Sequence, residues 1–444
     1  MKRFKKKRFA FILIILFPLF ISGQPARQLS LPGANDSLSL QQIIRQVTSS
    51  YPTVLKAQEA IKSADAAIGL ARSGYYPDIS GQAGYTRLGP GSKLSFPMLG
   101  TFELYPQNNY NAEIDVKETI YDFSKTSRNI KTEESGKTIS EKSVELVKQK
   151  LDLVTVVSYY TLVYLQEALK IINVQLDNLN DHLAFIIKKK ETGSATQYEI
   201  LSTQVRISTA ENQKVDIQSE IKTQQAILNS LLGFPVSTPL KVKQNLTLSN
   251  SVINPDSLVH FALQNRYEMI VAGLKEEHAN LQLKLVKAQN NPELDAFLTG
   301  GIKNGFFPNL NELTPNYVAG VGLHIPIFDA TRRKNNIKLA NVEINELKQA
   351  TEQTRRDISS EVYQNEASVA ASLQKINQSN MQVKQAEEAL DLAKVSYSSG
   401  AITNLDLLDA ETSAAESKVN LLKAQTDYAV SLARLNISIG RPLY

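Results

Sequence analysis

Apolar and polar residues alternate along four segments of the chain, and this alternation predicts four β-strands. The alternating segments are residues 79–86, 110–117, 293–298 and 317–325. A period of two residues places one apolar face on each strand. Stretches rich in glycine and proline, at residues 89–106 and 303–315, predict the loops that join the strands into two hairpins.

A second pattern predicts long helices. Apolar or small residues, Val154 among them, recur in steps of three and four from Val144 to Ile172, which is the spacing of a coiled-coil seam. We expect one continuous helix over residues 124–190 and another over residues 331–398, each roughly 100 Å long at 1.5 Å per residue. Shorter helices are expected at residues 38–73, 196–232, 256–290 and 403–439.

The chain contains this order of elements twice. The motif Ile-Tyr-Asp at residues 120–122 corresponds to Ile-Phe-Asp at residues 327–329, an offset of 207 residues. Gly193 and Gly400, where the long helices are expected to turn back, keep the same offset. The match indicates an internal duplication. Because two shorter helices equal one long helix in length, we expect them to stack end to end beside it.

The first 23 residues are predicted to be a secretory signal peptide. A basic segment at residues 2–8 precedes an apolar run of 13 residues from Phe9 to Ile21, and the small residues Ser22 and Gly23 follow. The run is too short for a membrane-spanning helix, although an anchor is the alternative interpretation.

Removing this leader changes the charge of the chain. Six of the 49 Lys and Arg residues lie in it, so the remaining 43 nearly balance the 44 Asp and Glu residues. The basic pI is therefore no argument for a nucleic-acid partner. The chain has no Cys, so packing and assembly are expected to replace disulfides. Its four His residues are scattered, and neither a phosphate-binding loop nor a metal cluster is visible, so no enzyme, metal or cofactor is expected.

These elements predict an α+β membrane protein whose strands are shared between copies. Four strands cannot close a barrel, since about eight are needed, and open sheet edges are not tolerated in lipid. Each copy should therefore contribute four strands to one barrel, and its helices should extend into the periplasm. The expected domains are a first repeat at residues 24–235 (β-hairpin 78–120, helical hairpin 124–232), an equatorial linker at residues 236–255, and a second repeat at residues 256–444 (β-hairpin 293–328, helical hairpin 331–439).

The ordered set of motifs resembles the TolC-like outer-membrane efflux protein family, also called outer membrane factors. The resemblance covers essentially the whole mature chain, including its strand-to-helix junctions and helical-hairpin tips. It implies a homotrimer in the outer membrane of a Gram-negative bacterium, with a twelve-stranded β-barrel continued by a periplasmic α-helical barrel. It also implies a passive exit duct for efflux or type I secretion. A periplasmic adaptor (membrane fusion protein) and an inner-membrane pump of RND, ABC or MFS type would dock and open it.

The resemblance implies a pore gate at the second tip. Asp406 and Asp409 lie three residues apart on one helix face and match the family's pore-constricting aspartates. In a threefold assembly they would form two carboxylate rings that attract cations. Glu199 holds the place of Asp406 in the first repeat and is a weaker candidate. The alternative interpretation is that the helix dipole alone favours carboxylates in a first helical turn.

Closure and docking are also expected at the tips. Tyr397 matches a residue of the family's closed-state latch, whereas Ile402 stands where some relatives have a latch arginine, so closure should depend on other contacts. Glycine suits a left-handed helix stop, and the exposed residues around each glycine are expected to dock the adaptor. These tip residues are Gly193, Ser194, Ala195, Thr196, Ser399, Gly400, Ala401, Ile402 and Thr403.

Aromatic residues near the strand ends are candidates for a belt at the interface with outer-membrane lipid, with scattered loop aromatics as the alternative. They are Tyr85, Tyr105, Tyr110, Phe306, Phe307 and Tyr317. The main alternative for the whole chain is a periplasmic adaptor or coiled-coil scaffold without channel activity. Such a protein would need only one helical hairpin, and it would not explain four membrane-length strands in two matched pairs.

Overall fold

The computed structural model describes residues 37–91, 93–97, 100–243 and 255–441, and the predicted signal peptide lies outside them. The elements of the first half are β1 (Ser37–Leu38), α1 (Leu40–Ser50), α2 (Pro52–Ser73), β2 (Asp78–Arg87), β3 (Lys93–Phe96), β4 (Gly100–Glu103), β5 (Asn108–Tyr121), α3 (Lys125–Glu191), α4 (Gln197–Leu232) and β6 (Lys241–Val242). Those of the second half are α5 (Pro255–Asn265), α6 (Tyr267–Ala288), β7 (Glu293–Lys303), β8 (Thr314–His324), α7 (Arg332–Ser398) and α8 (Asn404–Ser438).

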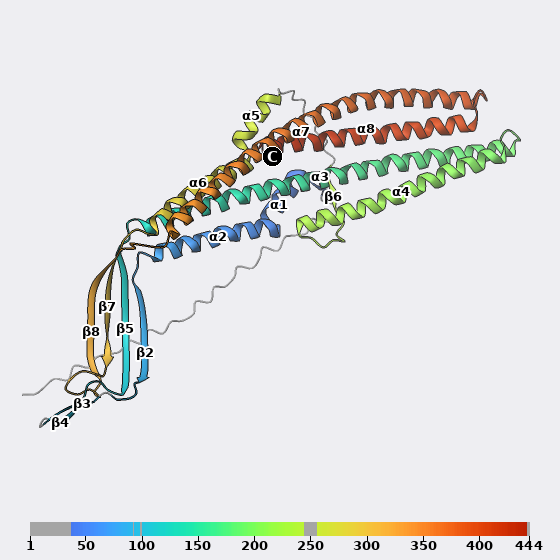
Figure 1. Ribbon diagram of the computed structural model, residues 1–444. Helices are drawn as coiled ribbons and strands as arrows, with labels where there is room; N and C mark the ends of the chain where they lie inside the picture. Colours follow the sequence, from blue (N-terminus) through green and yellow to red (C-terminus); the bar gives the residue numbers. More distant parts are fainter. Residues whose placement is uncertain (1–36, 92, 98–99, 244–254, 442–444) are drawn as a thin grey trace, which may run out of the picture. The chain divides into compact units, whose positions relative to one another are not determined.

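The four long strands form one antiparallel sheet in the order β2-β5-β7-β8 (Figure 1). Ile79, Val116, Leu298 and Ala319 lie opposite one another across all four strands. Residues in register share a face, so the predicted alternation is confirmed and one face of the sheet is apolar. Within the described chain, β2 and β8 each pair along one side only, so both outer edges of this sheet are open.

The opposite face of the sheet is mainly polar, apart from Phe297 and Val318, and it is cross-linked. Thr299 donates a hydrogen bond of 2.6 Å to Asp115, and the Lys117 ammonium lies 3.5 Å from the Asp295 carboxylate. These contacts join β5 of the first repeat to β7 of the second. The loop expected at residues 89–106 is less simple than predicted, because β3 and β4 form a small hairpin within it.

Each strand pair passes into its long helix through the same junction. Two consecutive residues adopt positive φ in both copies, at residues 123–124 and 330–331. The aspartate of each repeated motif then caps the helix: Asp122 accepts a hydrogen bond from the backbone N–H of Thr126, and Asp329 accepts one from that of Arg333. The motif that revealed the duplication is therefore a helix cap.

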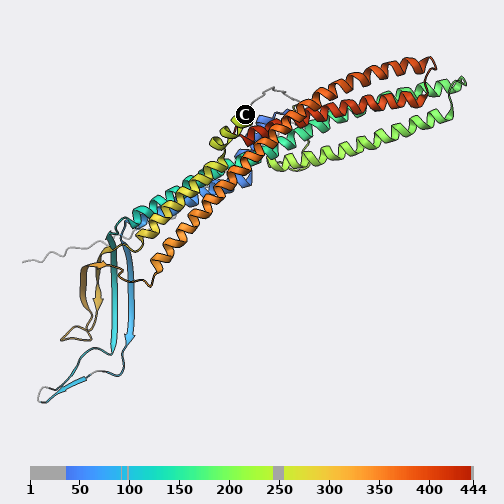
Figure 2. The same ribbon diagram turned by 45° about the horizontal axis from the view of Figure 1, so that its top comes forward.

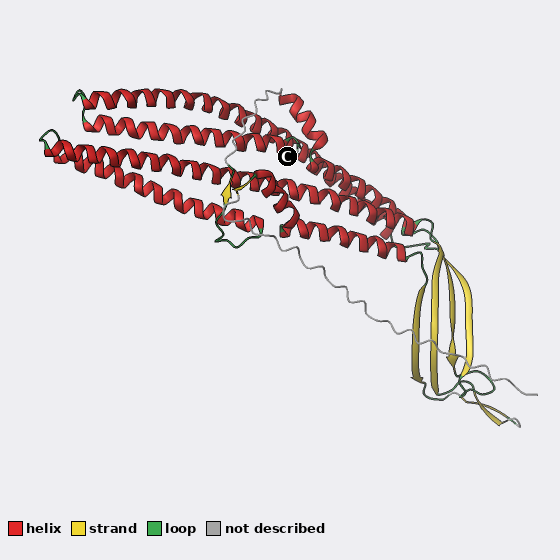
Figure 3. Ribbon diagram, turned by 180° about the vertical axis from the view of Figure 1, so that it is seen from behind, coloured by secondary structure: helices red, strands yellow, loops and turns green. Residues whose placement is uncertain are grey.

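The long helices carry shorter helices along their length. In Figure 1, α2 and α4 lie along different parts of α3, and α6 and α8 lie along different parts of α7. The expected placement of two short helices along one long helix is confirmed. Strands and long helices occupy separate parts of the fold (Figure 3). Among the described residues, no helix is long and apolar enough to cross a membrane.

The opening helix of each repeat is not continuous, so that prediction was wrong. Tyr51 is extended between α1 and α2, where Pro52 removes a backbone donor and starts a new helix. The second copy breaks at Arg266, which has nearly the same backbone angles although no proline follows it. The buried Arg266 side chain instead forms ion pairs with Glu268 and Glu361, and this network stabilises the break.

The predicted seam on α3 is only partly correct. Val144, Leu151 and Leu165 are buried as expected, but Val154 is 50% exposed. In this part of α3 the neighbouring Val156 and Tyr159 are buried instead. Val156 packs with α1 and α8, and Tyr159 packs with α1, α4 and β6, so contacts outside the seam determine which residues are covered.

Candidate functional site at the hairpin tips

Both helical hairpins turn at a glycine in the left-handed region. Gly193 has φ of +75° and Gly400 has φ of +77°, and open space surrounds the position of an added Cβ in both cases. Backbone conformation rather than crowding therefore requires glycine here. Most tip residues are exposed, whereas Ala195 and Ile402 are half-buried.

The return helices begin with matching capping boxes. In the first tip, Thr196 and Glu199 each accept a hydrogen bond from the other's backbone N–H, and Thr403 and Asp406 do the same in the second. Hydrogen bonds from Thr403 hold the pKa of Asp406 below its usual value. Asp406 is therefore part of the cap of its own helix. This leaves the gate role a prediction, because a capping carboxylate still carries its charge.

Asp409 forms an ion pair that sequence reasoning missed. Its Oδ1 lies 2.5 Å from a guanidinium nitrogen of Arg206 on α4, so the contact joins the second hairpin to the first. Arg206 and Asp409 are both partly exposed, which makes this pair sensitive to salt. The two predicted gate carboxylates therefore differ: Asp406 is bound within its own tip, whereas Asp409 is bound across hairpins.

Tyr397 also crosses between the hairpins. Its hydroxyl donates a hydrogen bond of 3.0 Å to Glu199, the residue expected at the equivalent of the gate position. Burial and the Glu199 carboxylate raise the pKa of Tyr397 to about 12. The ammonium of Lys189 lies 4.6 Å from the centre of the Tyr397 ring. The structure thus brings two predicted site residues, Tyr397 and Glu199, into contact.

A further buried polar contact lies beside these residues. His182 on α3 and Asn404 at the start of α8 are 9% and 5% exposed, and their side chains meet at 2.6 Å. Neither residue was predicted. The duplication contains a signal that could have indicated them. His182 and Asn404 differ from their equivalents in the other repeat, which are Ala389 and Gln197.

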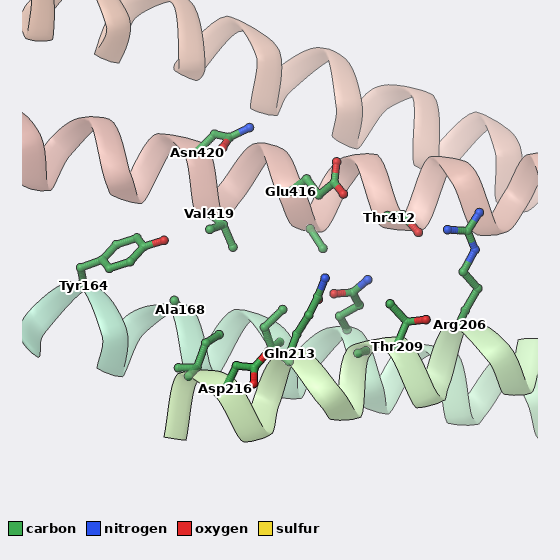
Figure 4. Close-up of a pocket in the computed structure, with 15 residues that line it drawn as sticks. Tyr164, Ala168, Arg206, Thr209, Gln213, Asp216, Thr412, Glu416, Val419 and Asn420 are labelled. Atoms are coloured by element: carbon green, nitrogen blue, oxygen red, sulfur yellow. The ribbon is translucent and has the colours of Figure 1, made fainter. Parts of the chain in front are cut away.

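A groove runs between the hairpins on the side of Arg206. It has a volume of about 350 Å³ and is lined by residues of α3, α4 and α8. Figure 4 shows Arg206, Asp216 and Glu416 around it, together with the Tyr164 ring. Figure 2 shows the two hairpins, α3 with α4 and α7 with α8, running beside each other. Among the described residues, no group of three His, Cys, Asp or Glu is arranged to hold a metal ion.

The six aromatic residues predicted for the interface are all exposed. Tyr85 and Tyr110 face each other across β2 and β5 with ring centres 5.1 Å apart. A second exposed set, which was not predicted, lies at the other end of the strands and includes Tyr76, Tyr121 and Phe328. Tyr121 and Phe328 belong to the repeated junction motif, which could have indicated them. An apolar sheet face with aromatic residues at both ends is typical of a lipid-facing surface.

The chain matches known proteins along nearly its whole described length. The family model described as outer membrane efflux protein matches residues 43–234 and 258–441. Outer membrane protein TolC of Escherichia coli (strain K12) is 21% identical over 443 residues, covering 97% of this chain and 86% of the relative. Alkaline protease secretion protein AprF of Pseudomonas aeruginosa is 23% identical over 346 residues, covering 75% of this chain and 70% of the relative. The crystal structure of the outer membrane protein VceC from Vibrio cholerae aligns with a TM-score of 0.75 at 18% identity, over 91% of this chain and 97% of that one.

Proposed function

The chain belongs to the outer membrane efflux protein family, and we propose that three copies of it form one continuous duct with a gate at the helical tips. Members of this family are exit ducts of the Gram-negative outer membrane that serve efflux or type I secretion. The two matched segments support the division of the chain into repeats at residues 24–235 and 256–444.

The observation that carries the proposal is the four-stranded sheet with two open edges. Its apolar face suits lipid and its polar face suits a water-filled lumen. Unpaired backbone groups at β2 and β8 would be costly in a bilayer. If β8 of one copy pairs with β2 of the next, three copies make a closed barrel of twelve strands, and no edge is left.

The helical hairpins extend this duct away from the lipid. Asp406 and Asp409 of three copies form the proposed gate, with Glu199 at the equivalent place in the first repeat. The hydrogen bond from Tyr397 to Glu199 is the proposed closed-state latch. Arg206 places a cation beside Asp409, so it partly offsets the Asp409 charge while the hairpins are in contact.

The exposed tips are the proposed docking surface for a periplasmic adaptor, which in turn binds an inner-membrane pump of RND, ABC or MFS type. Relatives named for secretion support an energised inner-membrane partner. Docking that pulls the second hairpin from the first would break the contacts of Tyr397 and Asp409.

Two measurements test this function. Outer-membrane fractions are extracted with a mild detergent and examined by native mass spectrometry, where we expect an assembly of three chains. The same preparation is inserted into planar bilayers, where we expect discrete, cation-preferring conductance steps. A chain that is released from the periplasm without detergent, as a monomer with no conductance, would instead identify the adaptor or scaffold alternative.

A further inference from the structure

The amide of Asn404 bonds to both helices of the first hairpin, and we propose that it holds the duct closed. We call this contact the Asn404 clasp; it comprises Asn404, His182, Ser202, Thr203 and the backbone carbonyl of Glu199. The term closed rests on the function proposed above, whereas the contact between the hairpins is independent of it. Ile402 has no polar group that could latch this tip. The clasp supplies a closing contact instead, and its partners on α4 are uncharged.

Hydrogen bonds determine the orientation of the Asn404 amide. Ser202 and Thr203 both donate their hydroxyl hydrogens to the carbonyl of Glu199, so their oxygens are left to accept. The Asn404 Nδ2 group lies 3.2 Å from the Ser202 oxygen, 3.3 Å from that of Thr203 and 3.4 Å from the Glu199 carbonyl. Its two hydrogens are therefore directed at α4.

The state of His182 follows from this orientation. With Nδ2 facing α4, the Oδ1 atom of Asn404 faces Nε2 of His182 at 2.6 Å. An amide oxygen only accepts, so Nε2 of His182 carries a hydrogen and donates it. Asn404 thus receives from α3 and donates to α4, which ties the start of α8 to both helices of the first hairpin.

The location of the clasp connects it to the gate. Asn404 is the first residue of α8, immediately after Thr403 and two residues before Asp406. A small displacement of the second tip would separate the donors and acceptors around Asn404 while they are still shielded from water, and unpaired buried polar groups are unfavourable. The tip is therefore held in one of two discrete arrangements, clasped or fully released, rather than in a graded series.

The first tip has no such contact. Gln197 occupies the position equivalent to Asn404 but is exposed, and its side chain accepts a hydrogen bond from Lys190 within the same tip. Gln197→Ala is therefore a matched control: it removes an amide from the same position of the other tip without touching the contact between hairpins.

The test measures the distance between spin labels on the two hairpins by double electron–electron resonance. Because the chain has no Cys, spin labels can be placed at Tyr198→Cys on α4 and Val395→Cys on α7, both exposed. Labelled chains are diluted with unlabelled chains in the full-length assembly, so that only pairs within one chain contribute. We expect one narrow distance in the parent and in Gln197→Ala, and a dominant longer population in Asn404→Ala.

Variants of His182 test the same contact from the other side, so the proposal can still be tested if Asn404→Ala does not assemble. His182→Ala should also release the tip, whereas His182→Gln should restore the narrow distance, because its amide can donate to Asn404 in place of Nε2. Both substitutions remove the imidazole ring, but only glutamine keeps a donor for Asn404. An unchanged distance in both Asn404→Ala and His182→Ala would overturn the clasp, as would release by Gln197→Ala. If the distances respond as expected but the assembly does not conduct, the clasp stands and the proposed duct fails.

Discussion

The two hairpin tips have the same backbone and different side-chain chemistry. Both turn at a glycine with φ near +76° and continue through a capping box. The first tip ends its long helix with three lysines at residues 188–190, whereas the last turn of α7 has no basic residue. In the second tip Asn404, Asp409 and Tyr397 all bind the first hairpin.

This difference separates what folds a tip from what controls it. Glycine and capping box were retained in both copies because each hairpin needs a stop and a start. The second-repeat members of the contacts across the hairpins, Tyr397, Asn404 and Asp409, differ from their first-repeat equivalents, Lys190, Gln197 and Ser202. Substitutions in one tip or the other therefore test which properties depend on these contacts.

The largest effect is expected from Asp406→Ala combined with Asp409→Ala, which removes both proposed carboxylate rings. Single-channel conductance should rise, and the concentration of divalent cation that half-blocks the current should increase at least about threefold, because the cation loses its ligands. The measurement is planar-bilayer recording with the cation on the side of the tips. Asp391→Asn, an exposed carboxylate on α7, is the control and should leave both values unchanged. Parent-like conductance and block in the double variant would reject the gate.

Arg206→Ser should act in the opposite direction. Ser413 is the equivalent residue in the second repeat, so the change makes the two copies alike at this position. Asp409 loses its cation, and divalent block should strengthen by about two- to fivefold, in keeping with the modest energy of a partly exposed pair. The difference should shrink at high salt, which screens the parent ion pair. Block that is unaltered at low salt would mean that Asp409 does not face the ion path.

The fold was predictable to the extent that local periodicity determines it. The helix expected over residues 124–190 is Lys125–Glu191, and the one expected over residues 331–398 is Arg332–Ser398. Strand faces followed from alternation alone. The break at Pro52 had a visible signal, but the break at Arg266 had none, because it depends on an ion pair with Glu361, 95 residues away.

The candidate site shows the same limit more clearly. Asp406 is bonded within three residues of itself, and a local motif was enough to single it out. Arg206 and His182 were missed because their partners lie 203 and 222 residues away. Only the register between the two hairpins brings these residues and their partners together. The local spacing of apolar and polar residues does not determine that register. Comparing the two repeats position by position would have narrowed the search.

Removing the cap threonines should test whether the tips fold independently of the gate. Thr196→Ala and Thr403→Ala should each destabilise the first turn of their helix by about 1 kcal/mol, measured as faster amide hydrogen exchange in that turn. Only Thr403→Ala should also change channel block. Because Thr403 keeps the pKa of Asp406 low, Asp406 of the parent stays charged as the pH falls, and divalent cations continue to block the channel. The variant should lose block at a higher pH. A shift of equal size in Thr196→Ala would remove the distinction between the tips.

The smallest effect is expected at Glu411, which is 8% exposed and has one carboxylate oxygen without a hydrogen-bond partner. Burial raises its pKa, against the opposing charges of His182 and Lys394. The unfolded carboxyl ionises near pH 4.3, so the folded protein should lose stability as pH rises from there through the raised pKa. Glu411→Gln introduces the side chain found at the equivalent position, Gln204.

We expect Glu411→Gln to be more stable than the parent by about 1 kcal/mol at pH 8 and equal to it near pH 4. The measurement is loss of helical circular dichroism on heating the detergent-solubilised assembly at both values. Gln204→Glu, the reciprocal change in the first repeat, is the matched control. A parent that is more stable than Glu411→Gln at pH 8 would show that the carboxylate has a favourable partner. Burial of the Glu411 carboxylate would then not dominate its effect on stability. The second tip would contain a charged contact in addition to those seen in the structure.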